Sequence, residues 1–298
     1  MGAARSAVPR GIVPVMGTGL IATAGTRDGV TLRTHRWPAE GATRAHVLLV
    51  HGIAEHAGRH SHVAARFAQA GLETHAYDIR GFGASGGARA YVERWSRYHD
   101  DLEDRLAAVR AAAAGLPVVL YGHSMGGLIA LGYVLADPPR PQPDLLVLSA
   151  PANTASIAGW KRALAAVLGR ALPRLAIANN LSPGGLSRDP VIEVAYRSDP
   201  LNTHNTTARL GMEFLHEQGR VGDRLARVDR LPVPTYVFHG SEDPIVPVSA
   251  SALLQGKGNV TRRLYPGMRH ERHTELAGGA VVDDTVRWIT DSLVNRGR

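Results

Sequence analysis

Short apolar segments alternate with amphipathic ones along most of this chain. Continuous apolar, β-branched runs such as residues 46–50 are typical of strands buried on both faces of a parallel sheet. Strands are expected at residues 46–50, 74–77, 117–120, 145–148, 234–240 and 261–265, and helices at residues 60–70, 100–114, 128–136 and 281–295. Because strands alternate with helices, the pattern predicts an α/β fold with a mostly parallel central sheet and helices on both faces.

The segment before the first buried strand follows a different pattern. Two β-like stretches between Leu20 and Trp37 flank the turn sequence Arg27-Asp28-Gly29, which predicts an antiparallel hairpin at a sheet edge. Residues 1–19 contain one apolar run, but Pro14 interrupts it and no small-residue cleavage site follows. We therefore interpret residues 1–19 as a flexible leader rather than a membrane span or a signal peptide.

The alternation stops after residue 151 and resumes only near residue 232. This interruption predicts an inserted helical cap at residues 152–231, between two parts of one core domain at residues 20–151 and 232–298. The ligand site of such a sheet is expected at the carboxyl ends of its strands.

Composition excludes some chemistry and leaves other classes open. The chain has 298 residues, 44% of them hydrophobic, which suffices for a large core, and it has no cysteine, which excludes disulfides and thiolate nucleophiles. Its net charge of +8 favours anionic surfaces. The basic residues are spread along the chain without a dense block, so nucleic-acid binding is not expected.

The sequence Gly122-His123-Ser124-Met125-Gly126 reads as a sharp turn between a buried strand and a helix. Glycines on either side of a serine let the strand and the helix approach closely, so the serine can occupy a strained apex. This pattern predicts a nucleophile elbow with Ser124 as the nucleophile.

A serine nucleophile needs a base and an acid that orients the base. Asp243 follows the strand at 234–240 and is the expected acid; Glu242 is the alternative, although its longer side chain one position earlier is expected to point away. His270 and His273 follow the last strand, and His270 is the expected base because it lies nearer the strand end. The order Ser, Asp, His is one of the known orders of such triads.

The oxyanion of a tetrahedral intermediate needs two backbone donors. We expect the N–H groups of Met125, directly after the nucleophile, and of Ile53, after the strand at 46–50. A metal site was weighed because His51, His56, His60 and His62 crowd one segment. They lack a carboxylate partner at metal-binding spacing, so neither a metal nor a cofactor is expected.

Several stretches together resemble the bacterial monoacylglycerol lipases of the α/β-hydrolase superfamily and their lysophospholipase-like relatives. The most specific are residues 51–59, with the sequence HGIAEHAGR, and residues 122–127, with the sequence GHSMGG. Further similar stretches are residues 78–85, 149–152, 187–190, 199–201 and 239–243. The resemblance implies an α/β-hydrolase fold, the triad Ser124, Asp243 and His270, and the oxyanion donors Ile53 and Met125.

The resemblance also implies that Glu55, Arg59 and His273 bind the glycerol headgroup at the polar end of the pocket. The alternative is that these residues form a buried polar network that supports the oxyanion loop. Phe82 departs from the family, which commonly has histidine there; we expect a structural role for that position.

The expected cap carries an amphipathic stripe. Its apolar members lie at helical spacing and its cationic members lie among them: Ile157, Trp160, Leu164, Val167, Leu168, Leu172 and Leu175, with Lys161, Arg162, Arg170 and Arg174. The segment from Ile157 to Ile177 is therefore expected to be a mobile lid that covers an acyl tunnel and contacts anionic lipid, unless it simply packs on the core.

These patterns together predict a serine carboxylester hydrolase that cleaves monoacylglycerols through an acyl-enzyme. The alternatives are a lysophospholipase, a broad medium-chain esterase, or a binding protein that uses a hydrolase fold without catalysis. We expect a cytoplasmic protein that contacts the membrane peripherally, and the oligomeric state stays open, a homodimer included.

Overall fold

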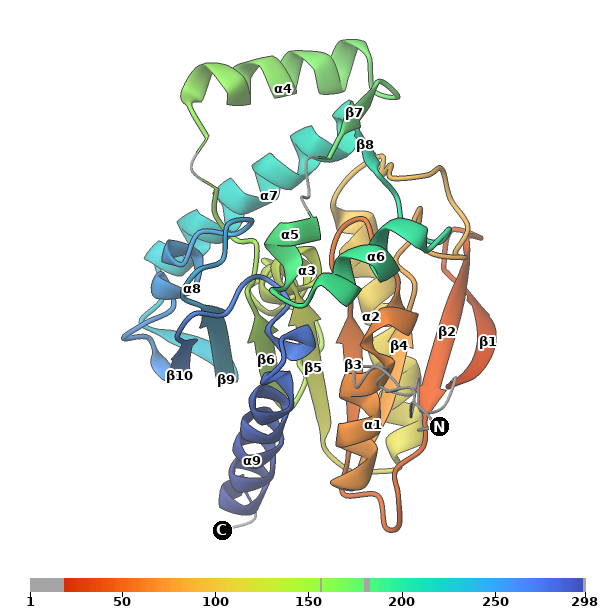
Figure 1. Ribbon diagram of the computed structural model, residues 1–298, viewed down its shortest axis with the longest axis vertical. Helices are drawn as coiled ribbons and strands as arrows, with labels where there is room; N and C mark the ends of the chain where they lie inside the picture. Colours follow the sequence, from red (N-terminus) through yellow and green to blue (C-terminus); the bar gives the residue numbers. More distant parts are fainter. Residues whose placement is uncertain (1–18, 156, 180–182, 297–298) are drawn as a thin grey trace, which may run out of the picture.

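The computed structural model describes residues 19–155, 157–179 and 183–296. The expected leader therefore lies almost wholly outside the described residues. Within them, one eight-stranded sheet has the strand order β1-β2-β4-β3-β5-β6-β9-β10 (Figure 1). Its strands are β1 (Leu20–Gly25), β2 (Thr31–Trp37), β3 (Ala45–Val50), β4 (Leu72–Tyr77), β5 (Val118–His123), β6 (Leu145–Ser149), β9 (Arg230–Gly240) and β10 (Gly258–Tyr265).

The pairing of these strands confirms the expected sheet. Strands β1 and β2 form the antiparallel hairpin, and β2 also pairs antiparallel with β4. All remaining pairs, from β4 through β3, β5, β6 and β9 to β10, are parallel. The carboxyl ends of the parallel strands therefore meet at one edge of the sheet, where the chemistry is expected.

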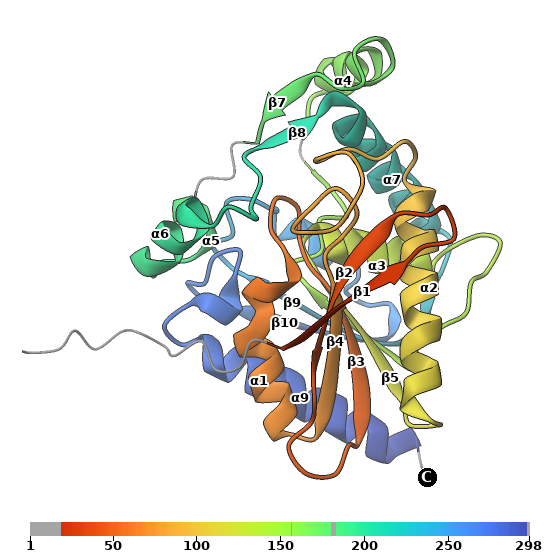
Figure 2. The same ribbon diagram turned by 90° about the vertical axis from the view of Figure 1, so that its right-hand side faces the viewer.

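Helices cover both faces of the sheet (Figure 2). Residues of α1 and α9 pack in one apolar core with the sheet, and residues of α2 and α3 pack in the other. The helices of the core domain are α1 (Ser61–Gln69), α2 (Ser96–Ala113), α3 (Met125–Val134), α8 (Ser249–Ala252) and α9 (Gly278–Arg296), with 3-10 turns η1 (Ala57–His60) and η2 (Arg272–Thr274). This three-layer arrangement confirms the α/β-hydrolase fold.

The chain between β6 and β9 rises above the carboxyl edge of the sheet (Figure 1). It contains α4 (Gly159–Ala171), β7 (Ala176–Ala178), α5 (Pro183–Leu186), α6 (Pro190–Ser198), β8 (Asn205–Thr207) and α7 (Ala208–Ala226). Helix α4 packs on α7, where Gly169 meets the side chain of Met212. We call this segment the cap.

Several elements begin two to four residues earlier than predicted, among them α2 at Ser96, β10 at Gly258 and α9 at Gly278. Helix α3 begins at Met125, not at residue 128, because Gly126 and Gly127 belong to its first turn rather than to the preceding loop. Strand β9 begins at Arg230, before the apolar run at residue 234, because Arg230 pairs with Gly258 of β10 across an irregular register. Glycine and charged residues are weak signals for a helix or a strand, so the predicted elements begin later than the observed ones.

Residue 126 must be glycine because the start of α3 lies directly against the end of β3. A Cβ there would overlap the carbonyl oxygens of Val50 and His51 at the end of β3, and one on Gly122 would meet the backbone of Gly126. Backbone atoms cannot yield as a flexible side chain does, so the start of α3 reaches β3 only because residue 126 lacks a Cβ.

We predict that Gly126→Ala lowers the free energy of unfolding by about 3 kcal/mol or more, because the added carbon forces α3 away from β3. Gly219→Ala is the matched control: Gly219 lies in α7 with nothing near its would-be Cβ, so alanine should stabilise by about 0.5–1 kcal/mol. Urea unfolding of both variants checks the prediction. Equal midpoints for the two variants would contradict the packing argument.

Candidate active site

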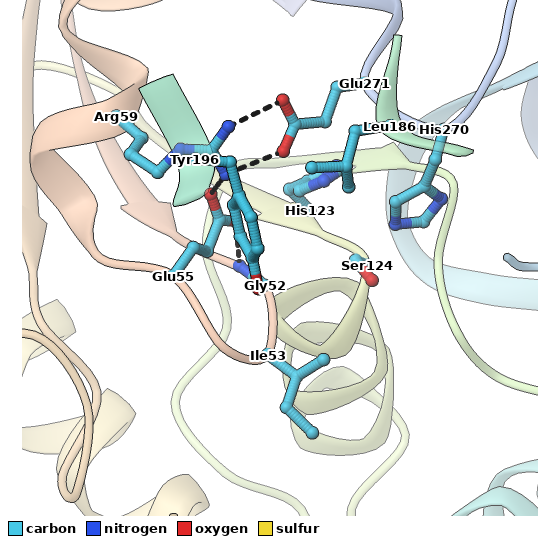
Figure 3. A pocket seen from close by; sticks show the side chains of 10 residues that line it. All are labelled: Gly52, Ile53, Glu55, Arg59, His123, Ser124, Leu186, Tyr196, His270 and Glu271. Carbon is cyan, nitrogen blue, oxygen red and sulfur yellow. Dashed lines mark hydrogen bonds and ion pairs between the residues drawn. The ribbon is translucent and has the colours of Figure 1, made fainter. Parts of the chain in front are cut away.

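Ser124 lies at the apex of the turn between β5 and α3. Its φ of 52° and ψ of −115° place a non-glycine residue in a region that side chains rarely adopt. Backbone hydrogen bonds hold this conformation, since Ser124 N donates to Ser149 O at 3.0 Å and Ser124 O accepts from Ala152 N at 3.0 Å. Such backbone strain is typical of a functional turn. The Ser124 side chain lies in the lining of a pocket (Figure 3).

Asp243 and His270 follow neighbouring parallel strands, β9 and β10, and the structure brings them together. Asp243 Oδ2 lies 2.8 Å from His270 Nδ1, and Asp243 Oδ1 accepts hydrogen bonds from the N–H groups of Ile245 and Val246 at 2.9 Å each. With Nδ1 bound to Asp243, Nε2 is the nitrogen free to accept a proton. His270 and Ser124 line the same pocket.

The charge state of Asp243 is fixed by its neighbours. Burial alone would raise the pKa of this carboxyl, but His270, the hydrogen bond from His239, and Arg272 outweigh burial and hold the pKa well below its ordinary value. The side chain of Asp243 is fully buried. Asp243 is therefore a carboxylate throughout the neutral range, as the orienting acid of a triad must be.

Glu242, the alternative acid, has a different position. Its side chain is 56% exposed and forms an ion pair with Arg188 of the cap. The Asp243 carboxylate holds the histidine and Glu242 faces solvent, so the geometry favours Asp243.

The loop after β3 carries Ile53, the second of the two expected oxyanion donors. Gly52 N donates to Glu55 Oε1 at 2.6 Å, which turns this amide away from the pocket. Ile53 lines the pocket, and no other described residue takes up the N–H of Ile53 or of Met125. The two expected amides are thus available to an oxyanion.

Cap residues hold this oxyanion loop from outside. Ala54, with a φ of 67°, presents its carbonyl oxygen to Thr203 N at 3.2 Å and to the Tyr196 hydroxyl at 3.3 Å. His56 Nε2 lies 2.7 Å from Asp199 Oδ2. The conformation of the loop therefore depends on the cap as well as on β3.

His51 stabilises the base of the same loop. Its Nδ1 donates to Gly52 O at 2.7 Å, and its Nε2 accepts from Ile79 N at 2.9 Å, which defines a neutral tautomer. Burial lowers the pKa of His51 to about 4, consistent with that neutral form. Phe82 is fully buried with its ring edge-on to His51, so this departure from the family pattern has the expected structural role.

The polar end of the pocket is built around Arg59. Its guanidinium forms a two-point ion pair with Glu271 at 2.8 and 3.0 Å and also reaches Glu55 Oε2 at 3.2 Å (Figure 3). Burial would raise the pKa of Glu55, but His60 and Arg59 outweigh it and hold that pKa well below its ordinary value. Glu55 and Arg59 thus line the pocket, and Glu55 also holds the backbone of the oxyanion loop through Gly52 N.

His273 does not belong with this group. The residues that line the pocket include His270 and Glu271, whereas His273 lies behind His123 and its ring contacts those of His60 and His62. The 3-10 turn η2 begins at Arg272, so residues 271 and 273 face different sides of the chain. Glu271 therefore occupies the place at the polar end that the sequence reading gave to His273.

Four residues of the pocket lining were not found from the sequence: His123, Leu186, Tyr196 and Glu271. Glu271 carried a usable signal, because a buried arginine such as Arg59 requires a carboxylate partner and Glu271 is next to the expected base. Leu186 and Tyr196 come from cap helices α5 and α6, and nothing in their local pattern indicates which way these helices face.

A further group of titratable side chains lies outside the pocket lining. Among the described residues, His46, Glu73 and His75 place ligand atoms close together. The nitrogens of the two histidines lie 3.0 Å apart and their ring centroids 5.3 Å apart, so the rings meet end to end, as in an N–H···N hydrogen bond. Glu73 Oε1 pairs with Arg36 at 2.8 Å and also lies 3.1 Å from His75 Nε2 and 3.7 Å from His46 Nδ1. His46, His75 and Glu73 thus form a hydrogen-bonded group with Arg36.

Comparison with known proteins matches this fold. The family model described as "Serine aminopeptidase, S33" matches residues 41–277. A monoacylglycerol lipase of Mycolicibacterium smegmatis is 35% identical over 89% of this chain and 95% of its own length. The crystal structure of a Paleococcus ferrophilus monoacylglycerol lipase is 28% identical, with a TM-score of 0.77, and covers 88% of this chain and 99% of that chain.

The fold is also that of a soluble variant of a Saccharomyces cerevisiae monoglyceride lipase in complex with a substrate analog. That structure has a TM-score of 0.83 at 22% identity and covers 94% of this chain and 97% of that chain.

We predict that Asp243→Asn and His270→Ala each lower kcat on a p-nitrophenyl ester by about 10³-fold or more, and that Ser124→Ala abolishes turnover. Glu242→Gln is the matched control, one position from Asp243, and should keep kcat within about threefold because its side chain faces solvent. Steady-state kinetics, with labelling by a serine-directed fluorophosphonate, provides the test. A Glu242→Gln variant more damaged than Asp243→Asn would require another acid.

Proposed function

Since the chain belongs to the serine aminopeptidase S33 family of α/β-hydrolases, together with bacterial monoacylglycerol lipases, we propose that it hydrolyses monoacylglycerols to a fatty acid and glycerol. The chain is a carboxylic ester hydrolase. The observation that carries the proposal is the Ser124 turn beside the Asp243–His270 pair, with a buried polar group on one side of the pocket.

The reaction follows from the geometry of these groups. Ser124 Oγ attacks the ester carbonyl carbon while His270 Nε2 takes its proton, and Asp243 stabilises the resulting imidazolium. The N–H groups of Ile53 and Met125 donate to the oxyanion. His270 then returns the proton to the leaving glycerol oxygen, and water, activated by the same histidine, hydrolyses the acyl-enzyme.

The charge at the polar end favours glycerol over a phosphate ester. Two carboxylates, Glu55 and Glu271, surround the single guanidinium of Arg59, so an added phosphate would meet excess negative charge. Neutral hydroxyls can donate to such carboxylates in a pocket from which water is largely excluded. This arrangement favours a monoacylglycerol over the lysophospholipid considered from the sequence.

A substrate panel tests this function. Esters with the same acyl chain on glycerol, lysophosphatidylcholine and p-nitrophenol, and an aminoacyl p-nitroanilide, should be ranked with the monoacylglycerol first by kcat/KM. Ser124→Ala should be inactive on all four. A preference for the lysophospholipid or the anilide would overturn the proposed substrate.

Headgroup variants sharpen the test. We predict that Glu271→Gln and Arg59→Lys each lower kcat/KM on the monoacylglycerol by about tenfold, because the two-point ion pair is lost, while the p-nitrophenyl ester changes by less than about threefold. His273→Gln is the control outside the pocket lining and should affect both substrates alike. Equal losses on both substrates for Glu271→Gln would mean that the network only supports the loop.

The cap presents an apolar stripe to solvent. Trp160, Leu164 and Val167 lie on one side of α4 and are 66%, 47% and 61% exposed, whereas Gly169 packs on α7. Lys161, Arg170 and Arg174 are exposed around this stripe. In the described residues no helix has the length and hydropathy of a membrane span.

We infer that the cap contacts anionic lipid surfaces through this stripe. Exposed apolar side chains flanked by cations are the pattern of an interfacial amphipathic helix, in which the apolar side enters the membrane and the cations lie at the headgroups. The eleven basic and seven acidic residues of segment 152–231 support the same partner. The edge of the sheet with the active site would then face the lipid.

We predict that Trp160→Ser weakens binding to anionic vesicles by about tenfold and slows hydrolysis of aggregated substrate, while a short soluble ester is turned over as before. Leu276→Ser is the control, since Leu276 is apolar and 88% exposed but lies outside the cap. Added salt should weaken binding, because charges are screened over about 10 Å at 0.1 M. If both variants bind vesicles like the parent, α4 has no role at the membrane.

A further inference from the structure

Arg272 lies behind the catalytic pair, where no role has been assigned to it. Its side chain has no solvent exposure, although it follows His270 by only two residues. An arginine is almost never fully buried unless its charge is compensated. The contacts that compensate it lead directly to Asp243 and to the end of β6.

The guanidinium touches both sides of the site. Its Nη2 donates to Ser149 Oγ at 2.6 Å, and its Nη1 lies 3.9 Å from Asp243 Oδ2, the oxygen that also binds His270. Its Cζ lies 5.1 Å from the centre of the Phe238 ring. Nε and Nη1 have no hydrogen-bond acceptor among the described residues. Hydrogen bonding therefore does not neutralise this cation, and Asp243 is the carboxylate within ion-pair distance of it.

We propose that Arg272 is a positioning residue. Its positive charge offsets part of the Asp243 charge that acts on His270, and its hydrogen bond to Ser149 fixes the loop after β10 to the end of β6. This inference rests on the proposed serine hydrolase function. Its consequence is an enzyme whose activity at the acidic end of its pH range depends on the charge of Arg272.

The direction of the expected change in pH dependence follows from the charges that face each group. Asp243 is faced by His270, His239 and Arg272, and Arg272 is faced by Asp243, Tyr121, Tyr265 and Glu271. His123 is the other titratable ring against His270, and burial, then His270, holds the pKa of His123 well below its ordinary value. Arg272 is thus the permanent cation on Asp243. Removing it leaves the full Asp243 charge to stabilise an imidazolium, so the acidic limb of the activity is expected at higher pH in an uncharged variant.

The contact with Ser149 extends the effect to the pocket wall. Ser149 Oγ lies 3.0 Å from Nδ1 of His123, and His123 lines the pocket next to Ser124. Ser149 O also accepts from Ser124 N, so Arg272 and the elbow share one residue of β6. Loss of this tether should lower kcat moderately, while KM stays the same because Arg272 does not line the pocket.

A pair of variants separates charge from packing. Arg272→Gln can still donate to Ser149 but has no charge, and Arg272→Lys keeps the charge on a side chain of similar length. Ser149→Ala keeps the charge of Arg272 and removes its tether, together with the contact between Ser149 Oγ and His123. The pH dependence of kcat/KM is measured for each full-length variant on p-nitrophenyl butyrate, which requires the triad but not the glycerol headgroup. Circular dichroism and thermal unfolding establish that each variant is folded.

We expect the acidic limb of kcat/KM to move to higher pH by about 0.5–1 unit in Arg272→Gln and by less than about 0.2 unit in Arg272→Lys and Ser149→Ala. The alkaline plateau of Arg272→Gln should stay within about tenfold of the parent. If Arg272→Gln does not fold, Arg272→Met takes its place in the same comparison.

Two results would overturn the proposal: an acidic limb of a folded, uncharged variant that coincides with the parent's, or a limb that moves as far in Arg272→Lys as in Arg272→Gln. The second result would mean that Arg272 only fills space. Failure of the proposed function is a separate outcome, recognised when Ser124→Ala keeps its activity or when monoacylglycerol is not hydrolysed.

Discussion

The active site depends on one close contact between backbones, that of Gly126 with the end of β3. Because residue 126 has no Cβ, the first turn of α3 reaches the carbonyl oxygens of Val50 and His51. The loop from β3 and the turn at Ser124 then lie against each other, with Gly52 near the Ser124 side chain. The amides of Ile53 and Met125, which come from different elements, can thus serve one oxyanion. A few tenths of an ångström in this contact decide whether both donors reach the same atom.

Buried strands and the order of the chemistry could be predicted from the sequence, and the reason is geometric. Parallel strands covered on both faces must be apolar along their length, so β3, β5 and β6 appear as continuous runs. The carboxyl ends of such strands meet at one edge, so Ser124, Asp243 and His270 were expected together without knowledge of distances. What a strand end cannot specify is the direction of each side chain in an irregular loop. Glu271 and His273 show this limit: they lie at the start of η2, a 3-10 turn of three residues, and of the two only Glu271 lines the pocket.

The polar side of the pocket shows a second limit of sequence reading. Glu271 lies 212 residues after Arg59 in the chain, whereas Glu55 and Arg59 are only four residues apart. Each of the three is stable when buried only because the others are present. The family resemblance implied Arg59 and Glu55, but residues considered one at a time do not reveal their obligatory third member. Tyr196 and Leu186 are harder still, because the direction of the cap helices is set by tertiary contacts such as that of His56 with Asp199.

The hydrogen bonds from Thr203 and Tyr196 to the carbonyl of Ala54 have a consequence for how this fold can be recombined. Caps are natural modules for exchange between related chains, since one continuous insertion carries them. Here part of the inserted segment also fixes the conformation of the loop that carries Ile53. A chimera that receives a foreign cap must therefore keep residues 196–203, or acquire a matching loop along with the cap, if it is to retain its chemistry.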